Sequence, residues 1–169
     1  MSKRELKKYL EQLSNEHLQE QIIELYEKFP LVKVYYDFVF KPNEDKLIDE
    51  AKAKILNEYF PTKRRKPKTR RSIAQKSIKH FINLGMDAFL LSDLMLFNLE
   101  VMLKYSKQKP QTSDAFYKSF LSSFGQLITY LTENGLTANY RDRVEAAVLE
   151  ISRQNWPNLF AFELIMERL

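Results

Sequence analysis

The stretch from Ala88 to Leu103 constrains the fold of this chain more than any other. Wound as a helix, it carries apolar side chains around nearly its whole circumference, and such a helix has to be covered on all sides. Ser92, Asp93, Asn98 and Glu100 interrupt it, and it is shorter than the roughly 20 residues that a membrane span requires. We therefore expect the central helix of a cytoplasmic protein that does not associate with a membrane.

Helical patterning continues along most of the remaining sequence, where apolar residues recur at intervals of three and four. The chain has only 3 Gly and 6 Pro, too few for the many turns of an all-β fold. We predict an all-α protein, a single domain over residues 1–169 that forms a compact irregular bundle of about eight helices. Stacked helix pairs, as in an α-solenoid, are the alternative. The absence of Cys excludes disulfides and thiolate metal sites.

Capping signals predict where the helices begin and end. Ser2 with Glu5 forms a capping-box pattern, Ser14 is a typical N-cap, and Pro30 suits the first turn of a third helix. The apolar faces that we expect the second and third helices to bury comprise Leu18, Ile22, Leu25, Tyr26 and Phe29, then Val32, Tyr35, Tyr36 and Val39. Further predicted boundaries lie at Asn43, Pro61, Gly85, Asp87, Lys107, Ser113 or Asp114, Asn134-Gly135, Asn139, Gln154 and Trp156-Pro157.

The formal net charge of +5 is concentrated in one segment. Residues 61–84 carry a net charge of +9 and contain no acidic residue, whereas residues 1–60 and 85–169 each carry a net charge of −2. The protein is therefore a mildly acidic body with a basic insert, and the insert is where an anionic partner would be attracted.

The basic segment is predicted to be a loop over residues 61–71, followed by a helix with a cationic outer face. No acidic residue lies between Tyr59 and Met86, so these cations have no partner close in sequence. The positive end of the helix dipole disfavours cations such as Arg70 and Arg71, and a bound phosphate would relieve that conflict. The predicted anion-binding residues within 63–79 are Lys63, Arg64, Arg65, Lys66, Lys68, Arg70, Arg71, Lys76 and Lys79.

These features favour a non-enzymatic binding or scaffolding protein. Nucleic-acid phosphates are the first candidate partner and an acidic protein surface is the second. Phosphate contacts alone would not read a base sequence, and a helix-turn-helix centred on Gly85 is excluded because its second helix is apolar on every side. Two alternatives stay open: an enzyme of unknown reaction with a pocket among Tyr/Phe-rich helices, and a protein–protein interaction module whose basic loop is merely solvated.

Catalytic patterns are not evident in the sequence. His17 and His80 are the two histidines, and His17 with Glu20 and Glu24 only weakly suggests a metal site, because the order of the Glu-x-x-His motif is reversed. Neither a phosphate-cradling glycine loop nor a Gly-x-Ser-x-Gly elbow occurs. We therefore predict no catalytic residue, no metal and no cofactor.

Several segments together resemble a known family. They are the N-terminal MSKRELKKYLEQLS, Tyr35-Tyr36-Asp37-Phe38, the Pro42-Asn43-Glu44 turn, Phe60-Pro61, the basic run, and SIAQKSIKHFINLG, which ends at Gly85. Over approximately residues 1–105, the chain resembles small helical bacterial proteins that are classed as a domain of unknown function. The resemblance implies a bacterial cytoplasmic protein, and it supplies no activity, cofactor or functional residue.

Overall fold

A computed structural model describes residues 2–62 and 65–167 of the chain. These residues form nine α-helices and no strand, which confirms the predicted all-α fold. Their contacts gather into two compact units, Met1–Asn43 (unit 1) and Glu44–Leu169 (unit 2). The expectation of one domain over residues 1–169 stays a prediction, and each unit is described by itself.

Unit 1 begins where the capping signals predicted. The Ser2 hydroxyl and the Glu5 carboxylate form the reciprocal bonds of a capping box, and the Ser14 hydroxyl accepts a bond from the His17 N–H. Pro30 occupies the first turn of the third helix. The helices of unit 1 are α1 (Lys3–Leu10), α2 (Asn15–Lys28) and α3 (Pro30–Phe40).

The apolar faces of unit 1 differ from the prediction. None of the residues in its three helices is buried, and Ile22 and Tyr35, which we expected to face a core, are each 45% exposed. A segment of about 40 residues is too small to enclose a core of its own. Helices α2 and α3 are instead joined near the surface, where the Tyr26 hydroxyl donates to the Asp37 carboxylate at 2.9 Å.

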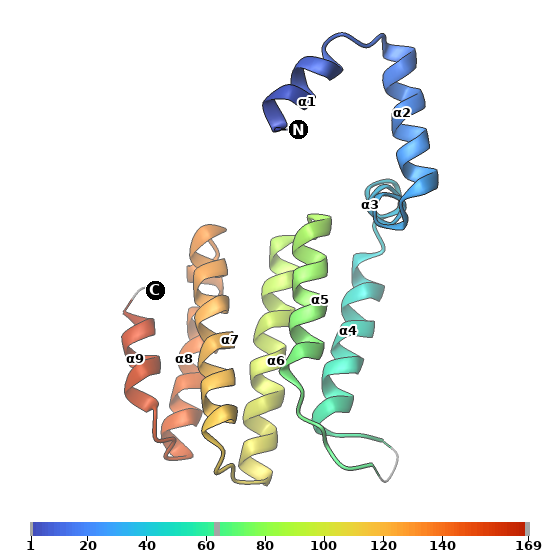
Figure 1. The fold of residues 1–169 in the computed structure, drawn as a ribbon. Coiled ribbons are helices and arrows are strands. Elements are labelled where there is room, and N and C mark those ends of the chain that lie inside the picture. Colours follow the sequence, from blue (N-terminus) through green and yellow to red (C-terminus); the bar gives the residue numbers. More distant parts are fainter. Residues whose placement is uncertain (1, 63–64, 168–169) are drawn as a thin grey trace. The chain divides into compact units, whose positions relative to one another are not determined.

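Unit 2 stacks three antiparallel helix pairs in two layers (Figure 1). Helix α6 contacts α4, α5, α7 and α8, so the predicted central helix is confirmed. The stacking of helix pairs is a feature that this bundle shares with the alternative prediction, the α-solenoid-like arrangement. One layer holds α4 (Glu44–Tyr59), α6 (Ala88–Gln108) and α8 (Thr137–Arg153), and the other holds α5 (Arg71–Leu84), α7 (Asp114–Glu133) and α9 (Leu159–Met166).

The core of unit 2 has an aliphatic part and an aromatic part. Leu91, Leu94 and Leu99 of α6 have no exposed surface. At the other side of the unit, the ring of Phe120 lies 4.9 Å from that of Trp156 and 5.7 Å from that of Phe162, both in edge-to-face geometry. Edge-to-face pairs of buried rings add to the stabilisation that comes from burial alone.

Two predicted boundaries need correction, while the cap of α5 is confirmed. Gly85 ends α5 with φ 73°, the left-handed conformation that favours glycine. Helix α6 continues to Gln108, so Lys107 does not begin the loop, and its side chain forms an ion pair with Glu150 of α8 at 3.1 Å. Helix α8 begins at Thr137, before the predicted Asn139.

Candidate anion-binding surface and adjacent groove

The loop between α4 and α5 is fixed at its second end by Glu58, which is 8% exposed. The Glu58 carbonyl accepts hydrogen bonds from the backbone N–H groups of Lys68 at 3.0 Å and Thr69 at 3.2 Å. Thr69 adopts φ 52°, which is uncommon for a residue with a side chain and follows from this tight return of the chain. The last described residues of the loop therefore have a defined position against α4.

Arg70 has an internal partner that the sequence argument missed. Its Nη2 and Nε atoms donate to the Glu58 carboxylate at 2.7 and 3.0 Å, in the forked geometry that suits a guanidinium. Hydrogen bonding from Arg70 holds the pKa of the Glu58 carboxyl below its usual value. The expectation that these cations lack a partner close in sequence is wrong for Arg70, because Glu58 lies just outside the acid-free stretch.

Arg71 joins α5 to α7 and keeps its charge uncompensated. Its Nε atom donates to the Ser123 hydroxyl at 3.0 Å, and its Nη2 atom donates to the Ser122 hydroxyl at 2.9 Å. Both partners are neutral, and no ion pair forms with Arg71 among residues 2–62 and 65–167. The first turn of α5 contains no acidic residue and no side-chain cap, so the positive end of its dipole adds to this charge.

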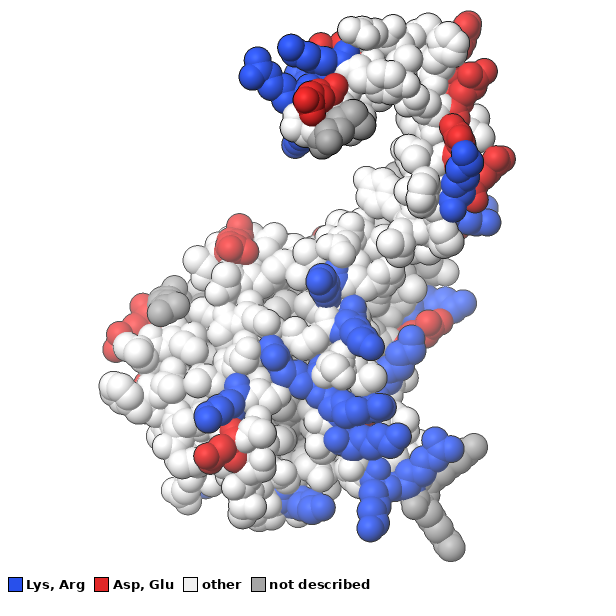
Figure 2. All heavy atoms as spheres, in the orientation of Figure 1, with Lys and Arg blue, Asp and Glu red and all other residues white. Residues whose placement is uncertain are grey.

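Five of the predicted cations form an exposed group, which we call the basic surface. They have no ion pair within the described part of the chain. Figure 2 shows Lys and Arg side chains gathered over α5 and the loop, with little acidic surface among them. Lys63 and Arg64 lie outside the described residues. The basic surface consists of Arg65, Lys66, Lys68, Lys76 and Lys79.

Helix α4 contributes a further cation near the basic surface. Lys54 lines a shallow depression between α4 and α5 together with Lys76 and His80, and Glu50 lies at the same depression. Sequence reasoning missed Lys54 because it lies outside the basic run. The helical spacing, which leaves Lys54 exposed beside the buried Ile55, could have indicated from the sequence that this lysine lies on the surface of α4.

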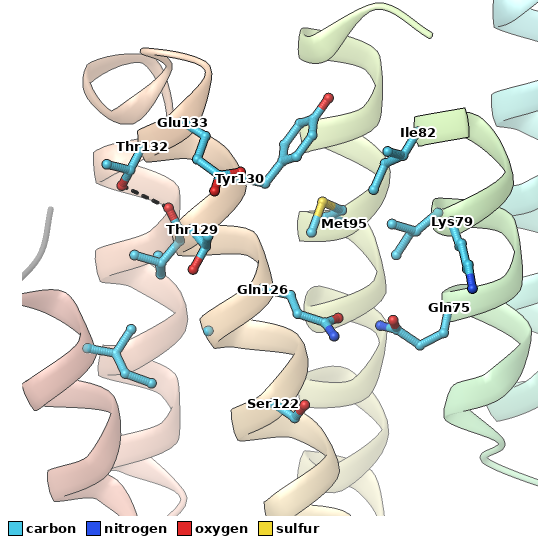
Figure 3. Close-up of a pocket in the computed structure, with 14 residues that line it drawn as sticks. Gln75, Lys79, Ile82, Met95, Ser122, Gln126, Thr129, Tyr130, Thr132 and Glu133 are labelled. Atoms are coloured by element: carbon cyan, nitrogen blue, oxygen red, sulfur yellow. Dashed lines mark hydrogen bonds between the residues drawn. The ribbon is translucent and has the colours of Figure 1, made fainter. Parts of the chain in front are cut away.

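A groove of about 800 Å³ runs along α7 in unit 2. One flank lies between α5 and α7 (Figure 3), and the lining of the other flank includes Ile165 of α9. The buried side chains of Ile78, Met95 and Ile128 form its apolar floor. The groove lies between two helices of the same layer, because α5 and α7 each pack on α6 and the side chains between them leave a gap.

The flank between α5 and α7 has a regular polar lining. The two helices run in the same direction (Figure 1). Moving four residues along either helix therefore advances about 6 Å in the same direction along the groove, and we call each such advance a step. Arg71 meets Ser122 at the first step, and Gln75 and Gln126 point toward each other at the second (Figure 3). Neither glutamine side chain makes a hydrogen bond within residues 2–62 and 65–167. At the third step Lys79 and Tyr130 line the groove.

The tyrosine hydroxyl at this groove stays protonated at neutral pH. Burial, and to a smaller extent the negative charge of Asp87, raises the pKa of Tyr130 above its usual value. Among the residues that the structure describes, Tyr130 is the single aromatic side chain of the lining. The pocket among Tyr/Phe-rich helices that the enzyme alternative requires does not coincide with this groove, and the aromatic residues of α3 are largely surface residues.

The weak metal pattern on α2 does not become a ligand cluster. His17, Glu20 and Glu24 line a shallow pocket with Tyr9, and the His17 Nδ1 atom lies 3.0 Å from the Ser14 hydroxyl. Across the described residues, no group of three or more His, Asp or Glu side chains is arranged to hold a metal ion. In the same residues, no helix has the length and apolar character to cross a membrane.

Comparison with known proteins places the chain in a family. A family model described as "Family of unknown function (DUF6155)" matches residues 1–169. The chain belongs to this family. The predicted membership in an uncharacterised family is thus confirmed, and it extends beyond the approximately 105 residues that carried the resemblance. No curated protein and no solved structure matches the chain.

Membership in the family of unknown function transfers no role to any residue. Bacterial origin and cytoplasmic location stay predictions. The chemistry of the site therefore has to be argued from the basic surface and the groove themselves.

Proposed function

We propose that this protein is a non-enzymatic binding or scaffolding protein whose basic surface engages nucleic-acid phosphates. The observation that carries the proposal is the exposure of Arg65, Lys66, Lys68, Lys76 and Lys79 without ion-pair partners in the described chain. Cations that form no ion pair keep their attraction for an external anion, and releasing counterions from a polyanion adds to the binding free energy.

The distribution of the cations favours a polyanion over a small anion. They extend from the loop to Lys79 on the outer face of α5, about 12 Å from the start of this helix at Arg71, and they do not converge on a closed pocket. The Glu58–Arg70 pair fixes the second end of the loop beside α5. Loop and helix thereby present their charges as one surface, which suits the repeated phosphates of a nucleic acid.

The test is a binding titration with a labelled duplex and a labelled single strand at two salt concentrations. A loop variant, Arg65→Ala/Lys66→Ala/Lys68→Ala, should reduce the slope of log K against log salt by about 2 to 3 if all three residues contact phosphates. The matched control Lys3→Ala/Arg4→Ala/Lys8→Ala removes one arginine and two lysines from the surface of α1, and we expect it to leave the slope unchanged.

Arg70 and Arg71 are poor choices for this test. Replacing Arg70 would leave the mostly buried Glu58 carboxylate without its partner, and replacing Arg71 would remove a link between α5 and α7. Loss of binding in either variant would not separate a phosphate contact from a disturbed loop. Binding that is insensitive to salt, or equal in the loop variant and the control, would contradict the proposal.

An acidic protein surface is the second candidate partner, since the same exposed cations would attract it. Polyglutamate of comparable charge serves as the probe. Two results together would identify nucleic acid as the preferred partner. The loop variant should lose affinity for the nucleic-acid strands, and the wild type should bind polyglutamate at least tenfold more weakly than it binds those strands. The reverse order would favour the acidic protein surface.

A further inference from the structure

The groove between α5 and α7 shares Lys79 with the basic surface, and this shared residue links the two features. Arg71 closes one end of the polar lining through its bond to Ser122, so cations stand at the first and third steps of the groove. Glu133 lies further along α7, beyond Tyr130. The groove therefore attracts negative charge near Arg71 and Lys79 and repels it near Glu133.

The side chains in the middle of the groove restrict what fills it. Gln75 and Gln126 point toward each other with no hydrogen-bond partner in the described chain (Figure 3). An aliphatic occupant such as an acyl chain would remove water from both amides and replace none of their hydrogen bonds, which is unfavourable. An occupant with a planar, polar edge satisfies them, because each amide offers two donors and an acceptor.

The floor and one end of the groove offer apolar and aromatic contacts to the two faces of a planar occupant. Ile78, Met95 and Ile128 supply apolar contact from below, and Tyr130 supplies one aromatic ring. The volume of about 800 Å³ lies within the range of small-ligand sites. A planar ring with hydrogen-bonding edges, attached to a negatively charged backbone, has the chemistry of a nucleobase in a nucleic-acid strand.

We propose that the α5–α7 groove takes an unstacked base of a single strand whose phosphates lie on the basic surface. The inference rests on the proposed function and deepens it. Arg71 and Lys79, which lie on either side of the Gln75–Gln126 pair, draw the sugar-phosphate backbone along the groove. The amides of Gln75 and Gln126 bond the edge of the base, and Tyr130 contacts its face. A base paired within a duplex is not available to enter, so single strands are preferred.

The experiment compares three labelled probes of equal length by fluorescence anisotropy: a base-bearing single strand, an abasic strand and a duplex. For wild-type protein, the base-bearing strand should bind about tenfold more tightly than the abasic strand. The variant Gln75→Ala/Gln126→Ala should lose that preference and keep its affinity for the abasic strand. The matched control Gln19→Ala/Gln108→Ala replaces two exposed glutamines outside the groove and should keep the preference.

Thermal unfolding of the groove variant verifies the fold, and a second variant, Tyr130→Phe, keeps the ring while removing its hydroxyl. We expect Tyr130→Phe to retain the preference for bases. Equal, salt-dependent binding of all three probes by wild type would overturn the groove inference and leave the phosphate proposal standing. Failure of wild type to bind any probe would overturn both.

Discussion

The guanidinium group of Arg70 lies 2.7 Å from the carboxylate of Glu58, across the loop that joins α4 to α5. The same glutamate accepts two backbone bonds from Lys68 and Thr69 through its carbonyl. One residue of α4 thus holds three consecutive residues of the basic segment. This contact fixes where the loop returns to the bundle, and it places Lys68 in the loop just before the start of α5.

The substitution Glu58→Gln should destabilise the protein. The amide cannot match the charge-assisted bonds to Arg70, although half-exposure of the Arg70 side chain (51%) reduces what the ion pair contributes. We expect a loss of about 1 to 2 kcal/mol in the free energy of unfolding, measured by urea denaturation. Glu163→Gln, at an exposed position of α9, is the control and should change stability by less than about 0.5 kcal/mol. An equal effect of the two substitutions would contradict the role of Glu58.

The contribution of Glu58 should depend on pH in a defined direction. Because bonding to Arg70 lowers the pKa of this carboxyl in the folded state, the stabilisation is complete above the usual pKa of 4.5. It is lost as the pH falls from 4.5 through the lower folded-state pKa, where the unfolded chain binds the proton more readily. The stability difference between wild type and Glu58→Gln should therefore shrink below pH 4.5. A difference that stays constant on acidification would count against this linkage.

The aromatic cluster predicts a large effect at one buried position. Phe120 has no exposed surface and contacts the rings of Trp156 and Phe162. Phe120→Ala should lower the free energy of unfolding by about 3 to 5 kcal/mol, because it removes apolar burial and leaves a cavity. Phe160→Ala makes the same chemical change at a site that is 76% exposed, and it should cost less than about 1 kcal/mol. Chemical denaturation of both variants measures the contrast.

Replacing each of two glycines with alanine should change the free energy of unfolding in opposite directions. Gly85 has φ 73°, where a side chain is strained, so Gly85→Ala should destabilise by about 1 kcal/mol. Gly125 lies inside α7, and an added Cβ atom would meet Ile165 Cδ1 at 3.8 Å, an ordinary contact. Gly125→Ala should therefore stabilise by up to about 1 kcal/mol through helix propensity. Thermal unfolding of the pair tests the prediction, and shifts of the same sign would refute it.

The separation into two units predicts the behaviour of fragments. All buried residues identified in the described chain lie in unit 2, from Ile48 onward. Residues 44–169 expressed alone should keep a cooperative unfolding transition, while residues 1–43 alone should lack one because they cannot bury a core. Circular dichroism during heating measures both. A non-cooperative transition in the longer fragment would show that unit 1 is needed for the core.

Much of the fold follows from local patterns in the sequence. The caps at Ser2, Ser14 and Asp87 and the left-handed Gly85 were predictable because each depends on residues within one helical turn. The apolar circumference of α6 required a central position for the same local reason. Burial of the faces of α2 and α3 was predicted wrongly, since an apolar stripe indicates a face that can be covered and does not identify what covers it.

Sequence alone therefore determined the helical elements, their caps and the concentration of charge in residues 61–84. Tertiary structure decided which cations remain unpaired, because Glu58 reaches Arg70 only after the chain turns back along α4. It also created the groove, by setting α5 and α7 in one layer on α6 so that Gln75 points toward Gln126. Contacts between residues about 50 positions apart depend on how helices pack, and a local pattern contains no information about that packing.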